Sequence, residues 1–593
     1  MSKKHNKRYV CDFETSTPEF YEKDGYARVW AWAMVDIDDL NTIIYGNRIE
    51  TLFERFEREE KDINIWYHNL KFDGQYLLWY LIYHNYTWVE NPRDKKVKPE
   101  PFTFSTVITD MGQWYQVQIY YADHKITIRD SLKLYNMSVD TIAKSLGFEE
   151  QKLSIEYTKY RPVGYELSPE EVDYISHDVI IVAKALKILF DAGHTKMTTG
   201  ANSLAEYKKM TKEFKTWFPE LSNKEDEFVR LSYKGGFTYL NPTHANKYYR
   251  RKGVVFDYNS LYPSILHDEL LPCGEGVRFE GKYKPNEEYP LYIQMITCEF
   301  ELKEGKIPSI QLKHSLDFKP NEYIESSNGQ LYTMVLASPD LELFFEQYDV
   351  YDVVYDGGYM YHGRNDMFTE FIDKLTEDKI RAKKEGNKAM YLLAKVQMNS
   401  LYGKMGSSPK GSLKKPNIND NETISYSNFI DDTRKSIYCP VASFTTAYGR
   451  KRIIEASQFI RKWTKEHYNE DRYIYSDTDS IHAFLSKEDV ESLKEFLDID
   501  DYKLGALKLE SEFTKAKYLR QKCYMELMTD GNLNVTIAGL PKKLAPIMNF
   551  KNFNVGFSTK DLPKEYLDSI GYKLTYKQVK GGVLLVNTDF TIK

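Results

Sequence analysis

The sequence predicts an α/β and α+β multidomain protein. Its 593 residues would divide into about four domains of ordinary size. Residues 1–200 alternate strand-like stretches, such as 8–16 and 62–70, with helical patterns, which is typical of an α/β domain. From about residue 230 a β-rich region is followed by a long helical pattern over 368–405, which indicates α+β organisation.

Composition favours a folded intracellular protein. Hydrophobic residues make up 42% and charged residues 28% of the chain, which is ordinary for globular domains. Five cysteines without CxxC spacing favour a reducing compartment and argue against a zinc or disulfide framework. No apolar stretch is long enough to span a bilayer, and the N-terminus lacks the apolar core of a signal peptide.

The charge distribution leaves two interpretations open. The net charge of −6 does not indicate a nucleic-acid binder, which usually has a basic surplus. Two stretches, 402–416 and 513–524, carry several lysines and no acid. Each could form part of a local basic channel or simply a solvated face.

A first set of acidic residues lies in the N-terminal region. Asp12 and Glu14 are two residues apart in a predicted strand, so their side chains share one face. Asp73 follows a second strand, and Tyr174 and Asp178 lie at i,i+4 on one helical face. Each pair alone is commonplace. Together they provide the acidic ligands that two-metal phosphoryl hydrolysis requires, with a phenol to orient water.

The order and element types of these residues resemble the DEDD group of 3′–5′ exonucleases. The histidine variant of that group would have His five residues before the last Asp, where Asp173 stands. The tyrosine variant, with Tyr174 four residues before Asp178, fits instead. His177 is out of register, and we interpret it as structural.

A second set of acidic residues lies in the C-terminal region. Asp257 ends an apolar strand, and Asp477 and Asp479 stand between two strand-like stretches. Asp is depleted in strands, so the latter pair either caps a turn or holds a strongly positive group. A predicted helical region carries a stripe of residues that either faces this acidic set or forms a solvated basic face. The residues of the stripe are Arg381, Lys388, Lys395, Asn399 and Tyr402.

The motifs "FDYNSLYP", "KVQMNSLYG" and "YSDTDS" resemble those of family B DNA polymerases. The stretches "YHNLKFDG", "MGQWY", "RPVGY", "YKGGFT", "AKYLRQKCY" and "DFTIK" extend the resemblance to the protein-primed subgroup, essentially from end to end. It implies a DNA-directed DNA polymerase that replicates a linear phage-type genome, with 3′–5′ proofreading and strand displacement.

The resemblance also implies an architecture. An RNase H-like DEDD exonuclease domain would occupy 1–198, and a right-hand polymerase the rest. Its palm would comprise 199–310 and 433–548, its fingers 368–405 and its thumb 549–593. Two terminal-protein-region insertions, 311–367 and 406–432, would dock a terminal protein and encircle DNA.

In the polymerase site, the resemblance implies that Asp257, Asp479 and the carbonyl of Tyr258 bind metal, and that Asp477 is a further catalytic carboxylate. Tyr262 would exclude a 2′-hydroxyl, although a buried core tyrosine is the alternative. The nucleotide would contact Tyr262, Arg381, Lys395, Asn399 and Tyr402. DNA would contact Tyr233, Gly235, Gly236, Ser260, Gly403, Thr446, Arg450, Lys522 and Tyr524.

In the exonuclease site, Asp12, Glu14, Asp73 and Asp178 would bind metal. Tyr174 would orient water, and Lys152 would assist the scissile phosphate. The single-stranded 3′ end would contact Thr15, His68, Asn69, Phe72, Ser131, Leu132 and Tyr157.

The implied cofactors are two Mg²⁺ per active site, with Mn²⁺ as an alternative. The implied partners are primer–template DNA, a single-stranded DNA 3′ end, dNTPs and a terminal protein that acts as primer. We expect a monomer without membrane contact in the host cytoplasm. Two competing hypotheses are a nuclease whose C-terminal part only binds DNA, and a non-enzymatic interaction protein.

Overall fold

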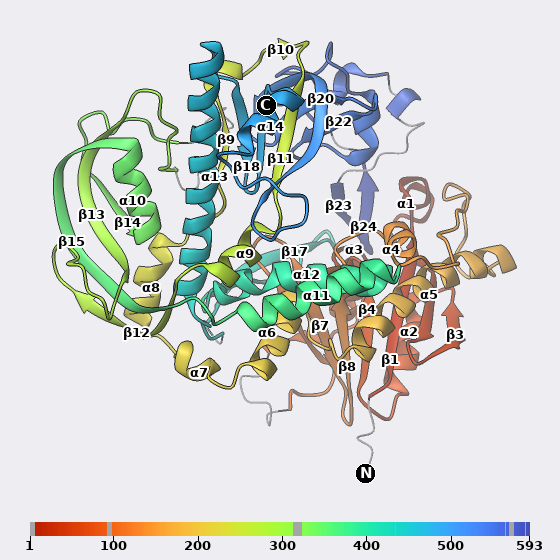
Figure 1. Ribbon diagram of the computed structural model, residues 1–593. Coiled ribbons are helices and arrows are strands. Elements are labelled where there is room, and N and C mark those ends of the chain that lie inside the picture. The colour runs from red at the N-terminus through yellow and green to blue at the C-terminus, as the bar shows by residue number, and fades with distance from the viewer. Residues whose placement is uncertain are drawn as a thin grey trace.

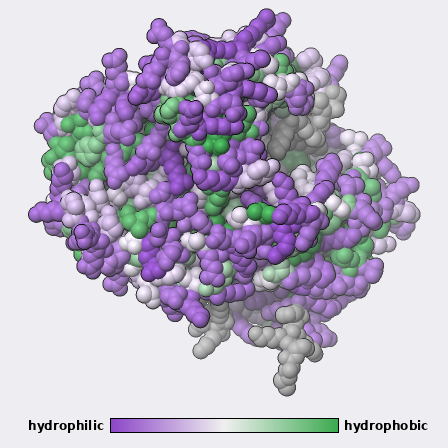
Figure 2. All heavy atoms as spheres, in the orientation of Figure 1, coloured by the Kyte–Doolittle hydropathy of each residue, from purple (hydrophilic) through white to green (hydrophobic). Residues whose placement is uncertain are grey.

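The computed structural model describes residues 6–91, 98–311, 323–432, 434–563, 565–567, 575–587 and 589–593. Parts of the predicted first insertion (311–367) and thumb (549–593) lie outside these described residues. No helix in the described ranges is both long and apolar enough to cross a membrane. The face of the molecule in Figure 2 is mostly hydrophilic, with separate hydrophobic patches.

An eight-stranded sheet organises the N-terminal domain, in the order β3-β2-β1-β4-β8-β7-β6-β5. Alternate residues of β1 enter two different cores: Cys11 packs with helix α3, whereas Val10 packs with helix α5. Helix α5 begins at a capping box between Ser168 and Glu171. The strands are β1 (Arg8–Thr15), β2 (Val29–Asp36), β3 (Asp39–Gly46), β4 (Ile63–Tyr67), β5 (Thr87–Trp88), β6 (Thr103–Ile108), β7 (Trp114–Tyr120) and β8 (Lys125–Asp130). The helices are α1 (Pro18–Asp24), α2 (Ile49–Glu57), α3 (Leu70–Tyr83), α4 (Val139–Leu146) and α5 (Pro169–Asp191).

A second sheet forms the C-terminal half, in the order β22-β21-β20-β11-β19-β18-β9, with β10 paired to β20. The long helix α13 (Cys439–Tyr468) runs beside this sheet (Figure 1) and packs on β18 and β19. The strands are β9 (Thr238–Leu240), β10 (Tyr248–Tyr249), β11 (Gly253–Tyr258), β18 (Tyr473–Asp477), β19 (Ser480–Ala483), β20 (Leu507–Arg520), β21 (Cys523–Met528) and β22 (Leu533–Ile537). Smaller helices are α6 (Thr199–Met210), α7 (Phe214–Trp217), α8 (Asn223–Ser232), α9 (Leu261–Asp268) and α14 (Lys487–Leu493).

A four-stranded sheet crosses the predicted boundary at residue 310. Its order is β12-β15-β13-β14, with β12 (Leu271–Phe279), β13 (Leu291–Leu302), β14 (Tyr332–Ala337) and β15 (Tyr348–Arg364). Helix α10 (Ser338–Gln347) packs on it. Strands β12 and β13, assigned to the palm from the sequence, therefore pair with strands of the first predicted insertion (Figure 1).

The predicted continuous helix over 368–405 is wrong, because two helices occupy this segment. Helix α11 (Thr369–Lys384) and helix α12 (Lys388–Met405) pack side by side (Figure 1). Gly386 has a φ of +66°, a backbone conformation that ends a helix readily with glycine. The side chain of Asn387 then caps α12 by accepting from the N–H of Met390.

Two β-hairpins dock on α3. The hairpin β16 (Gly411–Ile418)–β17 (Ile424–Asp431) lies in the second predicted insertion. Its Tyr426 hydroxyl donates to Oε1 of Gln75 at 2.6 Å, and the indole of Trp79 donates to the carbonyl of Glu422 at 2.9 Å. The hairpin β23 (Thr575–Val579)–β24 (Gly582–Val586) also contacts α3. Helix α3 therefore joins the N-terminal domain to both later segments.

Candidate functional site

Three acidic residues predicted for the C-terminal site meet at the ends of adjacent strands. Asp257 of β11 and Asp477 of β18 both stand opposite Ser480 of β19. Asp479 lies in the β18–β19 turn, and its carbonyl accepts from the N–H of Tyr258 at 2.8 Å. The turn requires Thr478 to adopt a φ of +62°, which is rare for a β-branched residue and directs the two flanking carboxylates.

Two of these carboxylates lie in a strongly acidic environment. Burial and the charges of Asp479 and Glu510 raise the pKa of Asp257 to about 7. Burial likewise raises the pKa of Asp479, and the charge of Asp477 adds to this effect. The carboxylate of Asp477 is instead paired, because Lys522 Nζ lies 2.7 Å from both of its oxygens. A cation bound between Asp257 and Asp479 would relieve their repulsion.

Asp257 and Asp479 line a cavity of about 680 Å³, whose lining residues do not include Asp477. Eight of the predicted residues contribute to its lining: Asp257, Tyr258, Ser260, Tyr262, Lys395, Asn399, Tyr402 and Asp479. Seven further lining residues with charged or phenolic side chains were missed by the sequence analysis: Lys379, Lys383, Tyr391, Asp501, Tyr502, Lys508 and Glu510. The two-residue period of a strand could have revealed Lys508 and Glu510, because both lie on one face of β20. Lys508 also pairs opposite Asp257.

Four acidic residues gather in the N-terminal domain. Asp12 and Glu14 come from β1, Asp73 from α3 and Asp178 from α5. Burial and the charge of Asp178 raise the pKa of Asp12 to about 7. Burial and neighbouring carboxylates also raise the pKa values of Glu14 and Asp73. The buried Oδ1 atoms of Asp73 and Asp178 find no hydrogen-bond donor among the described residues, so this acidic cluster is unsatisfied.

Three predicted neighbours surround this cluster. Lys152 Nζ pairs with Oδ2 of Asp178 at 2.5 Å. The hydroxyl of the buried Tyr174 shares a hydrogen bond with the hydroxyl of Tyr157, whose side chain is 45% exposed. The hydrogen-bonded hydroxyls of Tyr174 and Tyr157 therefore connect the region of the carboxylates with the protein surface.

The predicted residues for single-stranded DNA lie at the adjoining ends of β4 and β8. Asp130, which the sequence analysis missed, accepts from the backbone N–H groups of Asn69 and Leu132, both at 3.0 Å. The ring nitrogens of His68 lie 2.9 Å from the Ser131 hydroxyl and 2.7 Å from the carbonyl of Met137. Burial lowers the pKa of His68, which favours the neutral form of its ring. Phe72 is half-buried, and Thr15 ends β1.

Comparisons with known proteins identify the family of this chain. The family model "DNA polymerase type B, organellar and viral" matches residues 54–161 and 148–495. The DNA polymerase of Bacillus phage phi29 is 40% identical over 99% of this chain and 99% of its own length. The chain belongs to the organellar and viral type B DNA polymerases. This confirms the resemblance to family B drawn from the motifs.

Solved structures of phi29 DNA polymerase confirm the multidomain α/β and α+β fold. The complex with primer–template DNA and incoming nucleotide substrates has a TM-score of 0.87 and 38% identity, and covers 99% of this chain and 100% of that chain. The complex with single-stranded DNA has a TM-score of 0.86 with the same identity and coverage.

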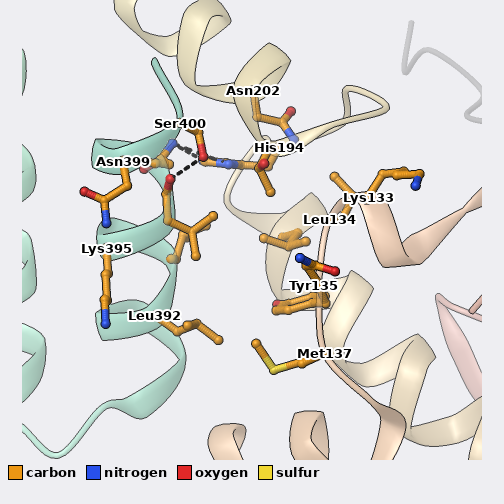
Figure 3. Close-up of a pocket in the computed structure, with 16 residues that line it drawn as sticks. Lys133, Leu134, Tyr135, Met137, His194, Asn202, Leu392, Lys395, Asn399 and Ser400 are labelled. Atoms are coloured by element: carbon orange, nitrogen blue, oxygen red, sulfur yellow. Dashed lines mark hydrogen bonds between the residues drawn. The ribbon is translucent and has the colours of Figure 1, made fainter. Parts of the chain in front are cut away.

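In this type B polymerase, α12 separates two cavities. Lys395 and Asn399 point to the side of α12 away from His194, as Figure 3 shows, and contribute to the lining of both cavities. On the other side lies a cavity of about 390 Å³ between α12 and residues 133–137. There Gln397 contacts the ring of His194 at 3.0 Å. The helix that carries the predicted nucleotide ligands is thus braced against the N-terminal domain.

Arg381 does not join the other predicted nucleotide ligands. It is absent from the cavity lining, and its guanidinium pairs with Asp378 at the exposed surface. The physical reason is helical periodicity: Lys379 and Lys383 are four residues apart on the face of α11 that lines the cavity, and Arg381 lies between them on another face.

The segment 233–236 lies against the carboxylate cavity. A Cβ atom on Gly236 would lie 2.8 Å from Oγ1 of Thr478 and 2.9 Å from the hydroxyl of Tyr262, so glycine permits this close approach. Gly235 is exposed and Tyr233 is half-buried. The ring of Tyr262 lies 4.3 Å from that of Tyr402, centroid to centroid.

Two predicted DNA ligands are buried instead of exposed. Thr446 is 2% exposed, and its hydroxyl bonds within α13. Arg450 is 5% exposed, pairs with Asp340 at 2.6 Å, and donates to the carbonyls of Lys234 and Gly235 at 2.9 and 2.6 Å. Arg450 therefore supports the segment 233–236, and any effect on DNA is indirect.

The remaining predicted DNA ligands are more accessible. Gly403 is exposed, and Ser260 begins α9 with a φ of +58°. Lys522 has a side chain 56% exposed despite its pairing with Asp477. Tyr524 packs its ring against those of Tyr475 and Tyr518.

The residues of both sites fit hard divalent cations. Their donor atoms are carboxylate oxygens, which Mg²⁺ prefers, and the buried Oδ1 atoms of Asp73 and Asp178 lack a hydrogen-bond donor among the described residues. No group of three or more His, Cys, Asp or Glu side chains within the described ranges converges to hold an ion alone. A metal in either site would therefore need further oxygen atoms, such as a backbone carbonyl or a substrate phosphate.

Proposed function

We propose that this type B DNA polymerase is a protein-primed replicase of a linear phage-type genome, with a separate 3′–5′ proofreading exonuclease and strand-displacement activity. The observation that carries the two-site part of the proposal is the presence of two acidic clusters on two different sheets, each with carboxylate pKa values raised by burial and mutual repulsion. Two such sites suit two separate phosphoryl-transfer reactions. Protein priming and strand displacement rest on the resemblance to the protein-primed subgroup.

In the polymerase site, Asp257, Asp479 and the Tyr258 carbonyl would hold the metal ions. When bound, Mg²⁺ neutralises phosphate charge and activates the attacking primer hydroxyl. Lys379, Lys383 and Lys395 line the same cavity and would bind the triphosphate, whose pyrophosphate part leaves when the primer hydroxyl bonds to the α-phosphorus.

The aromatic side chains of this cavity would select and place the nucleotide. The ring of Tyr262 packs against Tyr402 and would lie beneath the sugar, where a 2′-hydroxyl would clash. Asn399 and Tyr402 would face the incoming base. Lys522, now paired with Asp477, would contact the primer terminus, so Asp477 would be released or re-paired when DNA binds.

In the exonuclease site, Asp12, Glu14, Asp73 and Asp178 would hold the metal ions. Mg²⁺ there would supply a water molecule of lowered pKa. The buried Tyr174 would orient that water through its hydroxyl, and Lys152 would shift from Asp178 towards the scissile phosphate. The exposed Tyr157 would contact the strand.

The partners of the relatives support the proposed ligands. The phi29 polymerase has been solved with primer–template DNA, with single-stranded DNA and with incoming nucleotides. We extend these ligands to this chain, together with a terminal protein as primer. We further propose a monomer that acts in the host cytoplasm.

The deciding experiment separates the two activities. With a primed template, dNTPs and Mg²⁺, Asp257→Ala or Asp477→Ala should abolish extension and spare 3′ degradation. The pair Asp12→Ala and Asp73→Ala should do the reverse. Loss of both activities from either change would refute the two-site model, and degradation without any extension by the native protein would favour a nuclease that only binds DNA.

Protein priming requires its own experiment. The native protein is mixed with candidate terminal proteins, Mg²⁺ and a labelled dNTP, without any primer. Covalent transfer of the deoxynucleotide to a hydroxyl of the terminal protein supports the proposal. Incorporation that occurs only with a nucleic-acid primer would contradict it.

A further inference from the structure

The C-terminal hairpin β23–β24 is built into the N-terminal domain. Val579 and Val583 are buried in the same core as α3. The carbonyl of Val583 accepts from the hydroxyl of Tyr76, and the N–H of Ala27 donates to the carbonyl of Lys580 at 2.8 Å. Figure 1 shows β23 and β24 beside α3. The hairpin therefore has a fixed position on this domain, although it lies about 500 residues away in sequence.

Two glycines at the hairpin turn permit this docking. Gly581 has a φ of +90°, and a Cβ atom there would lie 1.9 Å from the carbonyl oxygen of Ala27. A Cβ atom on Gly582 would lie 2.6 Å from the ring of Tyr76. Because real Cβ contacts are longer than this, side chains at the turn would displace the hairpin.

Tyr576 on β23 reaches the predicted binding site for single-stranded DNA. Its hydroxyl accepts from Nδ2 of Asn69 at 3.2 Å. Its ring centroid lies 5.6 Å from that of Phe72, with 44° between the ring planes. Nζ of Lys71 lies 5.5 Å from the same ring centroid. Tyr576 is half-buried, so part of its ring stays accessible to a ligand.

Asn69 is held from two directions. Its backbone has a φ of +74°, and its N–H is fixed by Asp130 at 3.0 Å. The contact with Tyr576 then fixes the side-chain amide, which leaves Oδ1 of Asn69 for another donor. Asn69 and Phe72 lie four residues and one residue before the acidic Asp73 of the exonuclease cluster, so Tyr576 contacts the segment that leads into those carboxylates.

We propose that Tyr576 belongs to the binding site for the single-stranded 3′ end. It orients the amide of Asn69 and extends the aromatic surface of Phe72 on which a base can stack, with Lys71 close to the strand's phosphates. The inference rests on the proposed exonuclease function. It means that the 3′ end is bound jointly by the N-terminal domain and a hairpin from the opposite end of the chain.

Stacking gives the expected size of the effect. An aromatic side chain that stacks on a base contributes from about fivefold to over a hundredfold in affinity. Tyr576 shares its base with Phe72, so we expect about a tenfold loss for Tyr576→Ala. Tyr576→Phe keeps the ring and loses only the bond to Asn69, so a loss of about threefold is expected.

The experiment uses the full chain and a single-stranded oligonucleotide with 2-aminopurine at its 3′ end. The steady-state rate of 3′ degradation is measured for the native protein, Tyr576→Ala and Tyr576→Phe. The expected result is a larger increase of KM for Tyr576→Ala than for Tyr576→Phe, with kcat within about twofold of the native value. Gln578→Ala, which removes the contact to Gln75 from the same face of β23, should leave KM within about twofold and controls for docking of the hairpin.

Several outcomes would overturn the inference. One is an unchanged KM in Tyr576→Ala, and another is an equal increase in Gln578→Ala, which would show that Tyr576 only supports the hairpin. A fall of kcat for degradation together with a matching fall of primer extension would indicate a general structural role. If the native protein degrades no DNA, the proposed function fails first. Quenching of 2-aminopurine fluorescence on binding then tests Tyr576 independently, and equal affinity of native protein and Tyr576→Ala would overturn the inference.

Discussion

Replacing Asp12 by asparagine should stabilise the metal-free N-terminal domain at and above neutral pH. In the folded protein, burial and the charge of Asp178 hold the pKa of Asp12 near 7 instead of its ordinary 3.8. Asparagine has nearly the same shape and removes one negative charge from the cluster. The negative charge of the ionised cluster therefore destabilises the folded protein when no ligand is bound.

The magnitude follows from the pKa of Asp12. A rise from 3.8 to about 7 corresponds to about 4 kcal/mol of unfavourable free energy for the ionised form, at about 1.4 kcal/mol per unit. Asparagine must still satisfy a buried amide, and Lys152 loses one neighbouring carboxylate. We therefore expect a net gain of about 1–3 kcal/mol, which raises the unfolding temperature of a domain of this size by about 3–10 °C.

The sign of the pH dependence is fixed by the direction of the shift. Because the folded pKa of Asp12 is raised, the stability that its protonated form provides is fully present below the unfolded value of 3.8. It is lost as pH rises through the folded value of about 7. The difference in folding stability between Asp12→Asn and the native protein should grow as the pH rises across this window and then become constant.

Thermal unfolding measured in EDTA between about pH 5 and about pH 8.5 checks this expectation. Asp123→Asn, at an exposed turn of the same domain, is the matched control and should leave the unfolding temperature unchanged. Addition of Mg²⁺ should stabilise the native protein more than Asp12→Asn, because binding to the folded state alone raises stability. An Asp12→Asn variant no more stable than the native protein at alkaline pH in EDTA would refute the reasoning.

Three further predictions concern the polymerase cavity. Lys379→Met should raise the KM for dNTPs about tenfold in primer extension, and Arg381→Met should change it less than twofold; equal effects would contradict the assignment to different helix faces. Lys508 lies opposite Asp257 and lowers its pKa, so Lys508→Met should move the acidic limb of the pH–rate profile upwards by about 0.5–1 unit. Tyr262→Val should admit ribonucleotides in single-nucleotide incorporation, and unchanged sugar selectivity would argue for a purely structural ring.

The carboxylate sites were predictable because strand geometry is local. Asp12 and Glu14 share one face of β1 through the two-residue period, and Asp479 follows Asp477 through a tight turn. The break between α11 and α12 was not predictable in the same way. Gly386 and Asn387 are residues that often end one helix and begin the next. A single glycine nevertheless costs a helix only about 1 kcal/mol, so a continuous helix fits the periodicity equally well.

Contacts between distant segments escaped the sequence analysis. The pairing of β12 and β13 with β15 depends on residues far apart in the chain, and periodicity contains no information on such pairs. The contacts of Arg450 show that the role of a single residue can also depend on a distant segment. A motif places it near DNA, but its guanidinium is neutralised by Asp340, 110 residues earlier, and only the fold shows that this charge is internal.

Three sets of contacts surround the two acidic sites in this chain, and the second and third involve the N-terminal domain. Arg450 binds the carbonyls of Lys234 and Gly235 and so holds Gly236 against Thr478, between the polymerase carboxylates. Helix α12 is braced on the N-terminal domain through Gln397 and His194. The hairpin β23–β24 connects the C-terminal end of the chain to α3, which carries Asp73. Because packed elements move as units, a shift of the hairpin or of α12 changes the surroundings of both sites, so synthesis and degradation are expected to respond together to changes at these contacts.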